Sequence, residues 1–282
     1  MRMAEQSRAD FVALGDTEGY LRSISNLGIL WNRRGDLIGA RRLQEEVLIL
    51  AESLQIPKER CRARINLGHT CQLIGDFARS RQLLTEAQTM AGDGGAPMHA
   101  FALLNMSRLD IAENNPEQAA ETLQRAQPFI DTGNHFGQIE TWLLRGQIAT
   151  LQGRFADAVG CLSEGLKLAE SESSGAPREQ VELWQAMSAT QAAAGDYQAA
   201  LKAMHNANEI NASLRREGAV LQAATAVQRN AEEQAHLEAQ RASASASTGR
   251  DTLRELQELR LQLERANEEK DRLTQELARM TR

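Results

Sequence analysis

Small and bulky apolar residues recur along this chain at helical spacing, on both sides of a short polar turn. The turn reads Gly-Asp-apolar at Gly35, Gly75 and Gly195, Gly-Arg-Phe at Gly153 and Asn-Asn-Pro at Asn114. Successive turns are therefore 40, 39, 39 and 42 residues apart. Around each turn the apolar positions are offset by three, four or seven residues, which places them on one helical face. The pattern predicts five antiparallel helix pairs.

The small residues of this pattern indicate how closely the two helices of a pair approach. They stand seven positions before each turn and five after it, at Gly28, Gly68, Ser107, Gly146 and Ser188, and at Ala40, Ser80, Ala119, Ala158 and Ala200. Glycine or asparagine at the turn supplies the left-handed backbone that ends the first helix, and the following aspartate can cap the second. Because one pair cannot bury its own apolar face, the pairs must stack on one another.

The recurring pattern resembles the tetratricopeptide repeat (TPR), with five copies over residues 19–212 and a partial copy, read as an N-terminal helix, over residues 1–18. The resemblance implies an all-α fold in which helix-turn-helix units form a right-handed solenoid. The long period is similar to that of bacterial peptide-sensing regulators and kinesin light chains. Three departures predict loose packing: Arg145 replaces a leucine, and Asp110 and Gln191 replace an aromatic residue.

The tail after the last repeat predicts two further helices. Residues 213–241 are expected to form a long helix that caps the solenoid, and the Ala/Ser-rich residues 242–250 a hinge. Residues 251–282 carry a heptad pattern that predicts a coiled coil, with the dimerisation residues Leu256, Leu259, Leu263, Lys270, Leu273, Leu277 and Met280. The expected state is a homodimer, and the alternative is a helix that folds back on the solenoid. This tail resembles the linkers that precede GGDEF output domains.

Composition and motifs exclude several function classes. A net charge of −6 and a pI near 5.5 argue against general nucleic-acid binding. Three cysteines without a C-x-x-C pair, no long apolar run and no signal peptide favour a cytoplasmic chain without a membrane span. No catalytic or nucleotide-binding motif occurs, and the five histidines are scattered. We therefore expect no catalytic residue, no metal site and no cofactor.

The concave side of such a solenoid is lined by the first helix of each pair, and there the sequence predicts a peptide-binding groove. Asparagine stands two residues before the small position in three repeats, and its amide both donates and accepts hydrogen bonds. The predicted groove residues are Asn26, Asn66, Asn105, Arg22, Arg62, His69 and Arg108. They indicate a polar, basic groove for an acidic or carboxylate-bearing peptide. The alternative is that the asparagines serve helix packing.

These observations favour a non-catalytic module that binds a peptide or protein segment, as the sensory or adaptor part of a bacterial regulatory protein dimerised through its coiled coil. Two alternatives stay open. The chain is a structural scaffold whose groove is filled by its own terminal helix, or it is the N-terminal regulatory region of a diguanylate cyclase. The first alternative differs from the leading hypothesis in whether the groove asparagines are accessible to solvent.

Overall fold

The computed structural model describes residues 16–130, 135–171, 175–245 and 252–280, and within these ranges the chain is helical without strands. They form eleven α-helices, labelled α2 to α12, and one short 3-10 helix, η1 (Gln127–Phe129). The predicted all-α class is confirmed. The predicted partial repeat over residues 1–18 lies outside the described residues except for its last three.

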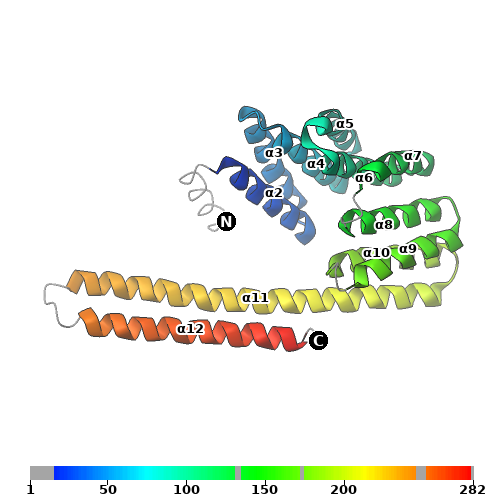
Figure 1. The fold of residues 1–282 in the computed structure, drawn as a ribbon. Coiled ribbons are helices and arrows are strands. Elements are labelled where there is room, and N and C mark those ends of the chain that lie inside the picture. Colours follow the sequence, from blue (N-terminus) through cyan, green and yellow to red (C-terminus); the bar gives the residue numbers. More distant parts are fainter. Residues whose placement is uncertain (1–15, 131–134, 172–174, 246–251, 281–282) are drawn as a thin grey trace. The chain divides into compact units, whose positions relative to one another are not determined.

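The first helices of the five pairs are α2 (Thr17–Arg34), α4 (Pro57–Ile74), α6 (Ala96–Ala112), α8 (His135–Leu151) and α10 (Pro177–Ala193). Their second helices are α3 (Leu37–Ser53), α5 (Phe77–Gly94), α7 (Pro116–Ala126), α9 (Phe155–Glu170) and the start of α11 (Tyr197–Ser245). Figure 1 shows α2 to α10 following one another as stacked antiparallel hairpins. The last helix is α12 (Thr252–Met280).

The five turns have the backbone that the sequence predicted. Gly35, Gly75, Gly153 and Gly195 have φ between 71° and 90°, and Asn114 adopts the same left-handed conformation with φ of 60°. Aspartate follows the glycine in three of these turns, and its carboxylate accepts a hydrogen bond from a backbone N–H of the second helix at 2.9–3.1 Å. The turn chemistry thus ends one helix and begins the next within two residues.

Close approach within a pair depends on the glycine seven residues before the turn. A Cβ added to Gly146 would lie 2.5 Å from Cγ of Leu162, and one added to Gly28 would lie 2.4 Å from Nε2 of Gln44. Both distances are far below van der Waals contact, so the second helix occupies the space of the missing side chain. The glycines therefore determine the distance between the two helices of a pair.

The core runs through the stack as a series of clusters, each built from successive helices. One cluster joins Ile139 of α8, Leu162 of α9, Leu183 of α10 and Ala203 of α11. Another joins residues of α2, α3 and α4. Because each cluster is completed by the next hairpin, stacking buries faces that a single pair leaves open, as expected for a solenoid.

The prediction of loose packing where Asp110 replaces an aromatic residue was wrong. Its side chain is fully buried: it accepts a hydrogen bond from Thr122 Oγ1 at 3.0 Å and pairs with Arg81 Nη2 of the preceding repeat at 2.7 Å. Arg145, by contrast, is exposed, with its guanidinium 5.1 Å from the centre of the Trp142 ring. A polar network replaces the expected aromatic residue at Asp110.

The chain divides into two compact units, residues 1–206 and 207–282. Helix α11 begins as the second helix of the fifth repeat, where Ala203 joins the core, and continues without a break to Ser245. Of the predicted hinge at 242–250, the first four residues are helical, and residues 246–250 lie outside the described part. The capping role of residues 213–241 stays a prediction.

Candidate binding groove

The first helices of the repeats line a groove of about 740 Å³ in the first unit. Each contributes side chains three or four positions apart, and therefore from one face. The lining residues include Ile29 and Arg33 of α2, Asn66, His69 and Leu73 of α4, Phe101, Asn105 and Arg108 of α6, Phe136, Glu140 and Leu143 of α8, and Glu179, Glu182 and Ala186 of α10. The groove thus extends across all five repeats.

Four of the seven predicted groove residues lie together in this groove, namely Asn66, His69, Asn105 and Arg108. The other three lie outside the groove, on α2 and α4. Asn26 and Arg22 are exposed, and Arg22 Nε donates to the backbone carbonyl of Glu18 at 3.4 Å. Arg62 pairs with the buried carboxylate of Glu59 at 2.8 Å.

The asparagine amides make hydrogen bonds within the protein. Asn66 Nδ2 donates to Ser25 Oγ of the preceding repeat at 2.7 Å, and Asn105 Nδ2 donates to the backbone carbonyl of Phe101 at 2.9 Å. A third asparagine, Asn32, donates to Thr70 Oγ1 at 2.8 Å. Two of these bonds join neighbouring first helices, so the packing alternative describes what Asn66 does in this structure.

Arg108 lies at the centre of the groove between carboxylates of the two following repeats. Its Nε is 3.0 Å from Oε1 of Glu140, and its Nη2 is 3.6 Å from Oε2 of Glu182. Glu140 is the main cause that raises the pKa of Arg108. Burial, and then the charge of Arg108, lower the pKa of the neighbouring His69 to about 4, so this imidazole is neutral near pH 7.

These contacts correct the expectation of a basic groove. Two arginines, Arg33 and Arg108, face three carboxylates, Glu140, Glu179 and Glu182. Arg108 pairs with Glu140 and Glu182, and the neutral imidazole of His69 adds no positive charge to the groove. Leu143 and Ala189 add apolar surface to the groove in repeats 4 and 5.

The sequence reasoning missed the exposed aromatic residues and the carboxylates of the groove. Phe101 and Phe136 retain 38% and 53% of their surface, which is unusual for large apolar side chains. A signal for three of the missed residues was present. Six residues before each small position the chain has Arg22, Arg62, Phe101, Glu140 and Glu182. If the position six residues before the small residue had been included in repeats 3 to 5, the sequence would have predicted Phe101, Glu140 and Glu182 as groove residues.

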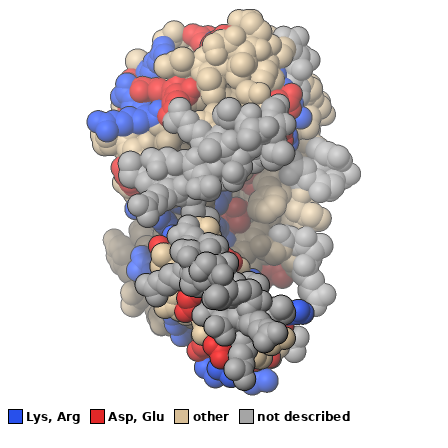
Figure 2. Space-filling view, turned by 90° about the vertical axis from the view of Figure 1, so that its left-hand side faces the viewer, with Lys and Arg blue, Asp and Glu red and all other residues tan. Residues whose placement is uncertain are grey.

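Surface charge outside the groove is mixed. On the face seen in Figure 2, the side chains of Lys and Arg (blue) and of Asp and Glu (red) lie next to one another rather than in separate regions. Local ion pairs elsewhere in the described chain, such as those of Arg64 with Glu52 and Glu86, also bring opposite charges together. Among the described residues seen in Figure 2, charges of one sign therefore form no extended surface.

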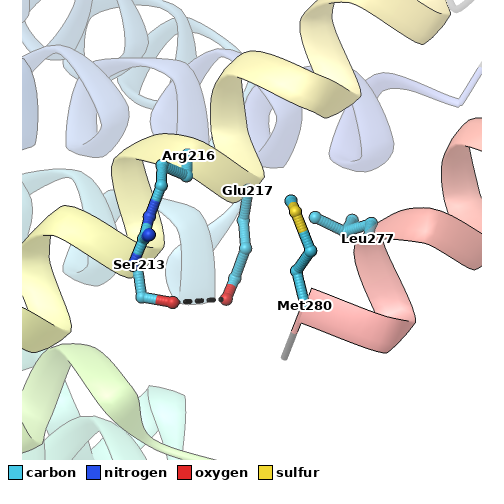
Figure 3. Close-up of a pocket in the computed structure, with 5 residues that line it drawn as sticks. All are labelled: Ser213, Arg216, Glu217, Leu277 and Met280. Carbon is cyan, nitrogen blue, oxygen red and sulfur yellow. Dashed lines mark hydrogen bonds between the residues drawn. The ribbon is translucent and has the colours of Figure 1, made fainter. Parts of the chain in front are cut away.

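The second unit places the predicted dimerisation residues beside α11 of the same chain. Figure 3 shows Leu277 and Met280, at the end of α12, next to Ser213 and Glu217 of α11, around a cavity of about 240 Å³. Because the end of α12 lies beside the part of α11 that begins this unit, the two helices run antiparallel and form a hairpin.

Burial of the predicted dimerisation residues in this unit is partial. Ala224 and Leu259 are buried, whereas Leu263 and Met280 are 38% and 62% exposed. Lys270, Leu273 and Leu277 are half-buried, and the side chain of Leu256 lies outside the described part. At Leu277 and Met280 the heptad seam thus lies beside α11 of its own chain.

The described residues were not found to include a metal site or a membrane-spanning helix. No group of three or more of their His, Cys, Asp or Glu side chains is placed to hold a metal ion. In the same part of the chain, every helix is too short or too polar to span a membrane.

Comparison with known proteins establishes the fold of this chain. No family model matches the sequence, and no curated protein matches it. The crystal structure of BtubC (BKLC) from P. vanneervenii aligns with a TM-score of 0.56 and 18% identity, over 76% of this chain and 89% of that one. A putative kinesin light chain of Podosopora anserina with TPR-like repeats aligns at 0.44 and 19% identity, over 70% and 97%. The alignment with BtubC shows that the chain shares the fold of that protein, in agreement with its all-α helix-turn-helix solenoid.

Proposed function

We propose that this chain is a non-catalytic protein-interaction module that binds a peptide or protein segment in the groove of its repeats. The observation that carries the proposal is the exposure of Leu73, Phe101 and Phe136 on three successive first helices within one groove. Contiguous apolar surface on a folded protein is typical of an interaction site. The groove is also large enough for several side chains, whereas the cavity in the second unit has about a third of its volume.

The proposal predicts that peptide binding depends on the two groove phenylalanines. Peptides selected on the full chain from a display library of random twelve-residue sequences should bind the Phe101→Ala/Phe136→Ala double variant at least about tenfold more weakly. Each substitution removes exposed aromatic surface that a ligand would bury, and fluorescence anisotropy measures the dissociation constants. Ile49→Ala is the matched control, because Ile49 is 70% exposed on α3 and does not line the groove. Equal binding to the double variant and the wild type would refute the proposal.

The hairpin changes which oligomeric state we favour. A parallel homodimer through the leucines of α12 requires this helix to leave α11, because the same seam faces α11 in the second unit. We therefore infer that the chain is a monomer with an intramolecular hairpin, and the coiled-coil dimer that would transmit a signal to a partner becomes the alternative.

Light scattering separates these two states. We expect a mass near 31.1 kDa for residues 1–282, and a monomer also for a version that ends at Arg241. Truncation removes α12 together with the seam, so it would abolish a leucine-mediated dimer. A dimer that becomes a monomer on truncation would contradict the intramolecular hairpin in solution and support the homodimer.

The other two hypotheses from the sequence remain alternatives. A scaffold with a self-filled groove requires the terminal helix to occupy the groove of the first unit. The regulatory region of a diguanylate cyclase rests on the resemblance of the tail to a linker. The scaffold hypothesis depends on the groove, and the cyclase hypothesis depends on the helical hairpin.

A further inference from the structure

The carboxylates at the α10 end of the groove indicate which kind of ligand it binds. Glu179 lies in the first turn of α10, close to the positive end of the helix. It forms no ion pair with the cations that the structure describes. Glu182 is half exposed, and it shares Arg108 with Glu140, which is the closer of the two carboxylates. Since three carboxylates face two arginines, Arg33 and Arg108, the groove has an excess of negative charge.

The apolar part of the groove is contributed by the neighbouring helices. Phe136 is one helical turn before Glu140 on α8, and Phe101 is two turns before Arg108 on α6. Arg108 links these helices to α10 through its contacts with Glu140 and Glu182. The aromatic rings and the carboxylates thus belong to one continuous surface, and a ligand bound on the rings lies within reach of the carboxylates.

We propose that the bound segment is basic and amphipathic, with a lysine or arginine that pairs with Glu179 and Glu182 and large apolar side chains that pack on Phe101 and Phe136. This inference rests on the proposed function and gives it a ligand class. It reverses the acidic peptide expected from the sequence, because Arg108 already pairs with Glu140 and Glu182 and the carboxylates of the groove outnumber its arginines. Charge complementarity of this kind controls selectivity and the rate of association more than the total affinity.

The test combines library composition with charge-neutral variants. Random twelve-residue peptides are selected on the full chain, and clones that also bind the Phe101→Ala/Phe136→Ala variant are discarded. We expect the remaining clones to be enriched in lysine or arginine next to leucine, isoleucine or aromatic residues. Their affinity for the wild type should decrease as the salt concentration is raised. At low salt, their affinity should be about tenfold lower for Glu179→Gln/Glu182→Gln than for the wild type.

Glu121→Gln is the matched control, since Glu121 is an exposed carboxylate on α7 outside the groove, and it should leave the affinity unchanged. Circular dichroism of each variant checks that the fold is retained. Groove-dependent clones that are acidic or uncharged, or that bind the double glutamine variant as tightly as the wild type, would overturn the inference and leave the proposed function intact. A selection without any groove-dependent clone would overturn the proposed function itself.

Discussion

Replacing Gly146 by valine is expected to lower the free energy of unfolding by about 3 kcal/mol. The added Cβ would lie 2.5 Å and 2.6 Å from the Cγ and Cδ2 atoms of Leu162, whose side chain is fully buried. Neither helix can accommodate the branched side chain unless α8 and α9 separate. Since the core cluster around Leu162 also includes α10 and α11, the separation would disturb the next repeat as well.

Urea unfolding followed by circular dichroism measures this effect, and the chain provides a matched control. Gly160 lies on α9, where an added Cβ meets nothing within 4 Å. Gly160→Val should therefore be neutral or stabilise the protein by a few tenths of a kcal/mol, because valine has the higher helix propensity. In a Leu162→Ala background the penalty of Gly146→Val should shrink, since the clashing atoms are gone. Equal effects of the two valine substitutions would show that close approach at Gly146 is not what positions α9.

Asp110→Ala is expected to destabilise the chain by about 2 kcal/mol. The substitution leaves the hydroxyl of Thr122, which is 2% exposed, without its acceptor and removes one carboxylate from Arg81. Breaking a fully buried ion pair costs about 3–5 kcal/mol. We expect less here because the Arg81 side chain is 39% exposed and keeps its contact with Glu113.

The same unfolding measurement tests this prediction, with Glu121→Ala on α7 as the control. Glu121 is exposed, so its removal should change the free energy of unfolding by less than about 0.5 kcal/mol. Thr122→Val should cost about 1 kcal/mol, since it deletes one hydrogen bond of the network and leaves the ion pair. If Asp110→Ala were as mild as the control, the polar network would not be what joins the second and third repeats.

The candidate site shows where sequence reasoning was sufficient. The stripe positions predicted from spacing placed Asn66, His69, Asn105 and Arg108 in one groove, because residues three or four apart share a helical face in any helix. The sign of the groove's charge was predicted wrongly. Arg108 binds carboxylates 32 and 74 positions away in the sequence, and no local pattern indicates which side chains a stacked helix brings to it.

The sequence by itself determined the features that depend on near neighbours. The left-handed turns, including the one at Asn114, the aspartate caps and the glycines that face a bulky side chain all follow from residues within one hairpin. Only the tertiary structure decided which partners the remaining groups find. The heptads of α12 indicate an apolar seam, but they do not determine which helix packs against it. The charge of Arg108 predicts a carboxylate partner, but it does not determine which residue provides that carboxylate. The physical reason is that these partners are separated by many residues, so their meeting depends on how helices stack rather than on local conformation.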